Sequence, residues 1–201
     1  METTTTFQEM LNEEQKRLKG MPAQAQLSHN SLQASEMRKM FTQFLMDNNP
    51  SKQGELATRP YECIFGDHPE LSAIRKQYGN KAPVAWLMPQ LKDLSEFCGV
   101  RDKMTNEQLL QCSYIISTEY GYLKTSELML FFHLFKAGRY GQFYGAVDPM
   151  KITTALRKFL ADRNEYFYRL EQKQKDEEKQ KAREGAVTYE EYKRMVADGL
   201  I

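Results

Sequence analysis

This sequence has few cysteines, almost no net charge and no long apolar run, and each of these features argues against a class of protein. The 201 residues include three cysteines at wide spacings without a CxxC pair, and three equally scattered histidines: Cys63, Cys98, Cys112, His29, His68 and His133. Structural zinc sites usually draw their ligands from short-spaced pairs, so no metal site is expected. We expect the cysteines to be reduced thiols in or near the core.

Charge and hydropathy argue against a membrane protein and against a broadly basic surface. Lysine and arginine total 28 and aspartate and glutamate total 27, so the net charge is +1. Contact with nucleic acid would therefore have to come from a local patch of cations. No apolar run approaches the roughly 20 residues of a membrane-spanning helix, and no apolar signal-peptide segment opens the sequence. The expected location is the cytoplasm, with no membrane partner.

The motifs of common catalytic and nucleotide-binding sites are also absent. The sequence contains no GxxxxGK[ST], GxGxxG, HExxH or GxSxG pattern. Its glycine-rich segment lies between predicted helices, whereas the glycine loops of nucleotide-binding proteins follow a strand. We therefore expect a protein that is not an enzyme and has no cofactor. Two alternatives stay open: a Cys/His nucleophile pair, and an enzyme of unrecognised type.

Helical periodicity dominates what the sequence does contain, so the predicted fold class is all-α. We expect a single irregular helical bundle over residues 31–170, preceded by a polar N-terminal tail or short helix at 1–30. Residues 171–201 are expected to form a charged helical extension with i,i+4 ion pairs, followed by a small terminal helix.

Capping residues, prolines and glycines set the expected boundaries inside the bundle. Helices are predicted at 31–47, 67–79, 82–99 with a bend at Pro89, 105–121, 125–138, and from 150 onward. Irregular structure is predicted for a linker after Pro22, a turn-rich stretch at 51–59 and an extended loop at 61–66. Trp86, the only tryptophan, is expected in the core.

The most concentrated apolar run lies near the middle of the chain and predicts a buried helix. Thr125 is a suitable N-cap, Lys136 lies in the last turn, and Gly138 can supply the left-handed residue that ends the helix. Between them, apolar residues follow almost without a polar break: Leu128, Met129, Leu130, Phe131, Phe132, Leu134 and Phe135. Such a helix must be surrounded by other elements. A buried strand is the alternative, which the cap, the stop and the scarcity of β-branched residues disfavour.

The segment that follows, Arg139–Gly145, places two glycines among three aromatic residues and a cation. Glycine permits positive φ angles and close approach of the backbone. Asp148 and Pro149 then provide the N-cap and the first residue of the next helix. We therefore expect a structured connection between two helices.

Two interpretations of this loop are open. In the first, the loop is a binding surface on which Lys136 and Arg139 contact phosphate. Tyr140 or Tyr144 would then stack on a base. In the second interpretation the aromatic side chains fold back and cover the core. We expect Phe143 to cover the core and Tyr140 and Tyr144 to have mixed roles.

Phe131-Phe132, Gly138, the Tyr140-Gly141-x-Phe143-Tyr144-Gly145 loop and Asp148-Pro149 carry a likeness to other proteins. On these residues the segment 128–166 resembles a stretch of uncharacterised helical proteins of Bacteroidetes and of their phages and mobile elements. The helical layout is also similar in architecture to phage replication accessory proteins of the helicase-loader class. These resemblances imply a role in DNA metabolism and a partner such as DNA or a replicative helicase, with no settled activity.

Two functional hypotheses follow. The first is a non-enzymatic accessory protein of a mobile element or phage-like replicon, which acts in DNA replication or maintenance by binding nucleic acid or a replication protein. Its contact residues would be Lys136, Arg139, Tyr140 and Tyr144. The second is a protein–protein interaction adaptor without nucleic-acid binding, which uses the polar helix after Leu170 and the terminal helix.

Overall fold

The computed structural model describes residues 23–184 and 189–199, and regular structure in these ranges is entirely helical. The elements are α2 (Ala23–Asp47), the 3₁₀ turn η1 (Pro50–Lys52), α3 (Gln53–Ala57), α4 (Pro60–Phe65), α5 (Leu71–Tyr78), α6 (Ala82–Phe97), α7 (Asn106–Glu119), α8 (Thr125–Lys136), α9 (Pro149–Glu184) and α10 (Tyr189–Ala197). The all-α prediction is confirmed. Residues 1–22, most of the predicted N-terminal tail, lie outside the described ranges.

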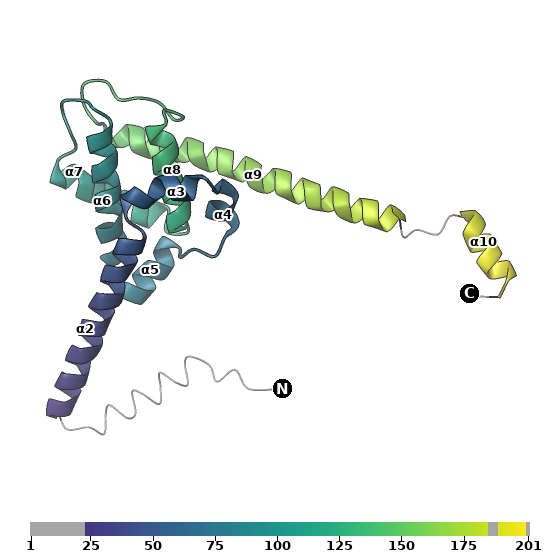
Figure 1. Cartoon of the computed structure of the whole chain (residues 1–201), viewed down its shortest axis with the longest axis horizontal. Helices are drawn as coiled ribbons and strands as arrows, with labels where there is room; N and C mark the ends of the chain where they lie inside the picture. Colours follow the sequence, from purple (N-terminus) through teal and green to yellow (C-terminus); the bar gives the residue numbers. More distant parts are fainter. Residues whose placement is uncertain (1–22, 185–188, 200–201) are drawn as a thin grey trace.

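Helix α8 occupies the centre of the body and carries its most continuous buried surface. Every residue from Leu128 to Phe132 is at most 3% exposed. Helices α3, α4, α6 and α9 pack around it (Figure 1). Trp86 of α6 is fully buried, as predicted, and donates its indole N–H to the carbonyl of Asn48 at 2.8 Å. Enclosure by neighbouring helices explains why the sequence of α8 has almost no polar break.

The start of α8 differs from the prediction, because its N-cap is Lys124 and not Thr125. Thr125 is the first helical residue, and its buried amide donates to the carbonyl of Pro69 at 2.9 Å. Glu127 caps the helix from its third position by accepting the amide of Lys124 at 2.9 Å. The same carboxylate is fully buried and forms an ion pair with Arg163 of α9. This pair ties the first turn of α8 to α9.

Several other predicted boundaries are confirmed. Thr105 and Gln108 form a reciprocal capping box at the start of α7. Gly79 and Gly138 follow α5 and α8 with φ angles of 101° and 80°, which suit glycine. Asp148 accepts a backbone amide of the first turn of α9 at 2.8 Å.

The predictions for the N-terminal third were wrong at three places, which are the start of one helix and two short helical regions. Helix α2 begins at Ala23 and not at Ser31. The stretch 51–59, predicted as turns, contains most of η1 and all of α3. The predicted extended loop at 61–66 is almost entirely helix α4. Proline occupies the first position of both η1 and α4, where its fixed φ angle suits a helix.

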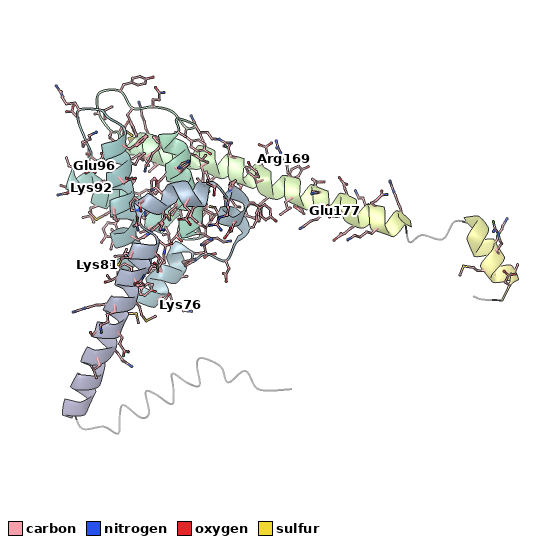
Figure 2. The ribbon with its side chains drawn as sticks, viewed as in Figure 1. Lys76, Lys81, Lys92, Glu96, Arg169 and Glu177 are labelled. Atoms are coloured by element: carbon pink, nitrogen blue, oxygen red, sulfur yellow. The ribbon has the colours of Figure 1, made fainter. Side chains whose placement is uncertain are left out.

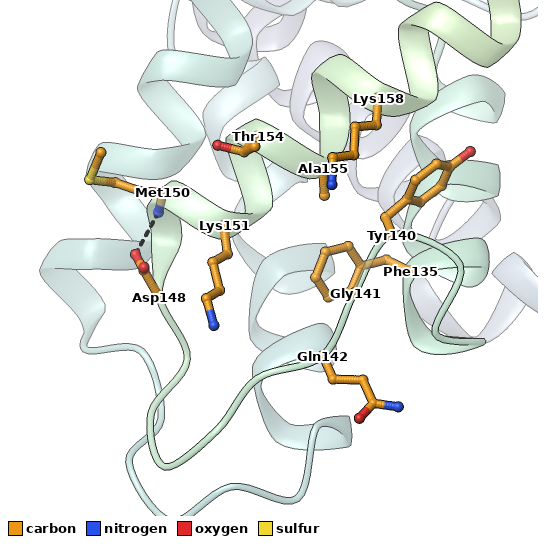
Figure 3. A pocket seen from close by; sticks show the side chains of 10 residues that line it. All are labelled: Phe135, Tyr140, Gly141, Gln142, Asp148, Met150, Lys151, Thr154, Ala155 and Lys158. Atoms are coloured by element: carbon orange, nitrogen blue, oxygen red, sulfur yellow. Dashed lines mark hydrogen bonds between the residues drawn. The ribbon is translucent and has the colours of Figure 1, made fainter.

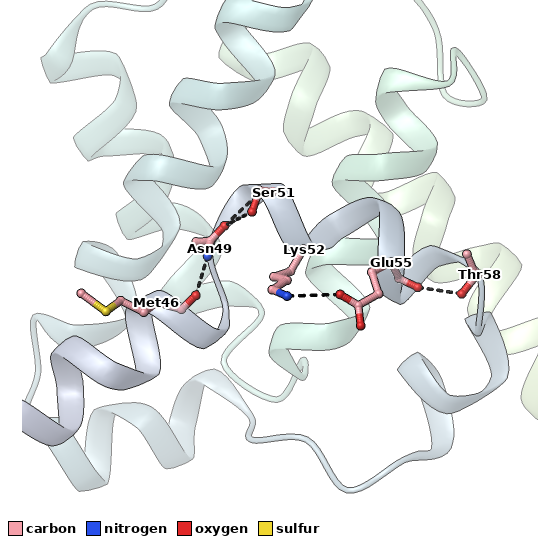
Figure 4. Close-up of polar contacts among 6 residues, drawn as sticks. All are labelled: Met46, Asn49, Ser51, Lys52, Glu55 and Thr58. Atoms are coloured by element: carbon pink, nitrogen blue, oxygen red, sulfur yellow. Dashed lines mark hydrogen bonds and ion pairs between the residues drawn. The ribbon is translucent and has the colours of Figure 1, made fainter.

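Local hydrogen bonds and one buried polar contact stabilise the region of η1 and α3. The side chain of Asn49 accepts a backbone amide of η1 at 2.9 Å, and the hydroxyl of Thr58 donates to the carbonyl of Glu55 at 2.7 Å (Figure 4). The buried side-chain amide of Gln53 donates to Gln90 of α6 at 2.6 Å. Because α3 also packs along α8, its helical state depends on residues far away in the sequence.

Helix α9 begins against the body and extends away from it in its second half (Figure 1). As predicted, the extension carries ion pairs one helical turn apart, with Glu171–Lys175 at 2.7 Å and Lys173–Glu177 at 3.8 Å. Side chains along this half, Arg169 and Glu177 among them, point into solvent (Figure 2). Within the described ranges, none of the helices combines the length and the apolarity needed to cross a membrane.

Candidate nucleic-acid interface

The loop between α8 and α9 has one side that closes over the core. Phe143 is 8% exposed, and its ring centroid lies 5.2 Å from that of Phe135. The ring of Tyr140 packs 6.0 Å from Phe131 and 6.2 Å from Phe159. Aromatic rings at these separations attract one another in addition to burying apolar area. This side of the loop is therefore a structural cover, which is the role expected for Phe143.

Backbone geometry holds the loop in place. Gly141 and Gly145 have φ angles of 116° and 76°, a region that side-chain-bearing residues rarely adopt. The amide of Asp102 donates to the carbonyl of Gly145 at 3.2 Å, and the amide of Val147 donates back to the carbonyl of Asp102 at 2.9 Å. These hydrogen bonds fasten the loop to the segment between α6 and α7, so the connection is structured as expected.

The other side of the loop forms an open pocket with the first turns of α9 (Figure 3). The pocket has a volume of about 410 Å³ and is lined by Phe135, Tyr140, Gly141, Gln142, Asp148, Met150, Lys151, Thr154, Ala155 and Lys158. Lys151, Thr154 and Lys158 are spaced at i, i+3 and i+7 along α9, which places them on one face of the helix. The face that α9 presents to the loop therefore carries two cations, beside the apolar side chains of Met150 and Ala155.

The electrostatics of the pocket favour an anion. Lys151 and Lys158 are both exposed, and neither forms an ion pair with any residue that the structure describes. Asp148, the acidic residue of the lining, is engaged in capping α9. The ammonium of Lys151 also lies 5.6 Å from the ring centroid of Tyr144, which is 79% exposed. A cation beside an exposed aromatic ring can hold a phosphate while a base stacks on the ring.

The structure separates the four contact residues predicted from the sequence. Lys136 is 17% exposed, pairs with Asp93 and lies 5.6 Å from the ring of Phe97, so its charge is already matched within the protein. Arg139 is half exposed and pairs with Asp162 at 3.2 Å. Tyr140 packs on the core and also lines the pocket, whereas Tyr144 is 79% exposed and lies beside Lys151 of the pocket.

Sequence reasoning missed Lys151, Thr154 and Lys158. Their i, i+3, i+7 spacing directly after the Asp148-Pro149 helix start was a readable signal of one polar face. That this face meets the glycine-aromatic loop depends on how α9 packs, which the local pattern does not contain.

Two of the three cysteines, Cys63 and Cys112, are buried. Burial raises the pKa of Cys63 to about 11 and that of Cys112 to about 12, so neither thiol is ionised at neutral pH. The thiol of Cys63 donates to the carbonyl of Leu56 at 3.2 Å. Among the described residues, no group of three or more His, Cys, Asp or Glu side chains is placed to hold a metal ion.

Comparison with known proteins gives one similarity, which covers the pocket. Residues 103–198, which are 96 of the 201, match the family described as "Family of unknown function (DUF6633)". The matched span contains α7, α8, the loop and most of the chain beyond it, and so includes every lining residue of the pocket. No curated protein and no solved structure matched the chain.

Proposed function

We propose that the protein binds nucleic acid through the pocket between the α8–α9 loop and the start of α9, as a non-enzymatic accessory protein. Phosphates would contact Lys151 and Lys158, and Tyr144 would stack on a neighbouring base. Arg139 would provide a further phosphate contact at the edge of this surface. Its guanidinium is half exposed, and one ion pair leaves other N–H donors free.

The observation that carries the proposal is a pair of cations on one concave surface, in a protein of nearly balanced charge. Net charge is +1, so there is no general positive field. On the extension of α9, two lysines form ion pairs with glutamates one turn away. In contrast, Lys151 and Lys158 stand one above the other along a concave surface. A polyanion is the class of ligand that such a surface suits.

The biological setting rests on the sequence resemblance to proteins of Bacteroidetes phages and mobile elements. In that setting the protein would act in the cytoplasm, in the replication or maintenance of a mobile element or phage-like replicon. DNA and a replication protein such as a helicase are the partners to test first.

The test is a titration of labelled DNA and RNA oligonucleotides followed by fluorescence anisotropy across a salt series. We expect Lys151→Ala/Lys158→Ala to weaken binding and to reduce the slope of log K against log salt by about 1–2, because two phosphate contacts are lost. The matched control is Lys76→Ala/Lys81→Ala, which removes the same charge at the end of the body away from the loop (Figure 2). Equal losses in the two double variants, or a wild-type protein that binds no oligonucleotide, would contradict the proposal.

A protein–protein adaptor is the second candidate, because two helices expose apolar side chains. Leu110, Tyr114 and Ile115 of α7 are each between 40% and 48% exposed. Helix α2 likewise exposes Leu32 and Met37. An adaptor without nucleic-acid binding would bind no oligonucleotide. It would form a complex in cell extract that size-exclusion chromatography detects, and Leu110→Glu/Ile115→Glu would abolish that complex.

A further inference from the structure

A second cavity, between α4, α8 and α9, lies directly beside the pocket lined by Lys151 and Lys158, which is called the basic pocket below. Its volume is about 130 Å³. The inner wall is largely apolar and is formed by Ile64, Leu130, Leu134 and Phe159, beside the mostly buried Arg163, which pairs with Glu127. The rim is polar and partly exposed, and is formed by Arg139, Asp162 and Tyr166. An apolar interior with a few polar groups at the mouth is the usual make-up of a site for a small planar ligand.

The rim offers both a hydrogen-bond acceptor and donors. Oδ2 of Asp162 accepts from the hydroxyl of Tyr140 at 3.0 Å and forms an ion pair with Arg139, whose Nη2 lies 3.2 Å away. Within the described part of the chain, no donor contacts the other carboxylate oxygen of Asp162. Arg139 has five N–H groups and uses one of them in this ion pair. A ligand with an amino group next to a ring nitrogen or carbonyl matches this arrangement.

The two cavities are neighbours on the surface of α9. Tyr140 lines both of them and forms the wall between them. Lys158 of the basic pocket and Asp162 of the second cavity are one helical turn apart, a spacing of about 5–6 Å between their Cβ atoms. One nucleotide can therefore extend across Tyr140, with its phosphate at Lys158 and its base at Asp162.

We propose that the second cavity receives one unpaired pyrimidine base, so that the protein binds single-stranded nucleic acid. This inference rests on the proposed function of the basic pocket. The volume suits one six-membered ring, since a cavity of about 150 Å³ in another protein holds benzene. Cytosine fits the rim well, because its exocyclic amino group donates to carboxylates. A base in a duplex would first have to leave its stack and its partner.

The experiment compares three labelled probes of equal length at one salt concentration: an oligo(dC) strand, a deoxyribose-phosphate strand without bases, and a duplex. We expect the abasic strand and the duplex to bind about 5- to 150-fold more weakly than oligo(dC), which is the range for one base contact. Leu134→Phe, which fills the cavity, should reduce the advantage of oligo(dC). Leu160→Phe is the matched control, because Leu160 packs beside the core without lining the cavity.

Stacking on Tyr144 would also favour a strand that has bases, so Tyr144→Ala is measured in parallel. If none of the probes binds, the proposed function fails and this inference fails with it. If the abasic strand or the duplex binds as well as oligo(dC), the proposed function stands and this inference is overturned. The inference is also overturned if Tyr144→Ala loses the stronger binding of oligo(dC) while Leu134→Phe retains it. If Leu134→Phe does not fold, Tyr166→Ala replaces it, because Tyr166 lies at the exposed rim of the cavity. This variant should likewise reduce the advantage of oligo(dC).

Discussion

Tyr140 and Tyr144 stand four residues apart in the same loop, yet their surroundings are opposite. The ring of Tyr140 packs against Phe131 and Phe159, and its hydroxyl donates to Asp162 at 3.0 Å. The ring of Tyr144 is 79% exposed, with the ammonium of Lys151 5.6 Å from its centroid. One tyrosine helps to hold the fold together, whereas the other leaves its surface available to a ligand.

The difference between them comes from what the neighbouring helices present on each side of the loop. On the closed side, α8 and the buried stripe of α9 offer apolar rings, so aromatic residues gain by packing there. On the open side, the first turns of α9 present Lys151 and Lys158. On the proposed function, folding and binding would rest on different side chains of this region, and substitutions would separate them.

The largest effect is expected where the closed side meets the core. Phe131 is fully buried and packs against Phe132, Phe135 and Phe159. Phe131→Ala should lower the free energy of unfolding by about 3–5 kcal/mol, the usual range for a buried phenylalanine. Urea unfolding followed by circular dichroism measures this. A loss below about 1 kcal/mol would mean that α8 is not the centre of the core.

A somewhat smaller loss is expected from Glu127→Ala, which removes one partner of the buried ion pair between α8 and α9. Arg163 would keep its charge while 17% exposed, and the amide of Lys124 would lose its acceptor. We expect a cost of about 3 kcal/mol, at the low end for a broken buried pair because Arg163 retains some access to water. Urea unfolding of Glu127→Ala beside Glu96→Ala, an exposed carboxylate of α6, checks this. Equal stabilities for the two variants would refute it.

Much of the fold was predictable because local signals coincide with the element boundaries. The Thr105–Gln108 capping box, Gly138 and the Asp148-Pro149 pair each act within a few residues of the helix end that they mark. Asn49-Pro50 and Pro60 did mark the starts of η1 and α4, but these elements are too short for a helical hydrophobic period to be recognised. Helix α3 is five residues long and is held in position by packing against α8 and by the hydrogen bond from Gln53 to Gln90.

The candidate site was predictable only in part, because part of it depends on contacts between residues far apart in the sequence. The sequence identified the loop as unusual, and its glycines do have positive φ angles. It could not show that Asp93, 43 residues before Lys136, would pair with that lysine. Nor could it show that α9 would turn Lys151 and Lys158 toward the loop. Charge pairing between distant residues is decided by packing and not by local pattern.

A smaller effect is expected from Tyr140→Phe, which keeps the ring and removes the hydrogen bond to Asp162. At neutral pH the loss should be about 1 kcal/mol. Burial and this hydrogen bond hold the pKa of Tyr140 well above its ordinary value of 10 in the folded protein. The unfolded chain therefore loses its proton first, and the hydroxyl's contribution is complete below pH 10 and declines as the pH rises above 10.

The stability difference between wild type and Tyr140→Phe should accordingly narrow above pH 10. Urea unfolding of both proteins at pH 7, 9 and 10.5 measures it. A difference that grows with pH would contradict the assigned hydrogen bond.

The smallest effect on stability is expected at the open side. Tyr144→Ala should change the free energy of unfolding by no more than about 0.5 kcal/mol, because the side chain is largely exposed. The same substitution should weaken oligonucleotide binding by about 1–3 kcal/mol, the range for one stacked base. Thermal melting and anisotropy titration check the two halves of this prediction.

The most direct test of the division between the two sides measures unfolding and oligonucleotide affinity on the same preparations of Tyr144→Ala and Phe143→Ala. Phe143→Ala should lose about 2 kcal/mol of stability through lost apolar burial and keep the affinity of wild type per folded molecule. Tyr144→Ala should keep its stability and lose affinity. The opposite pattern, with Tyr144→Ala unstable and its folded fraction binding normally, would show that the whole loop is a cover for the core and would contradict the proposed interface.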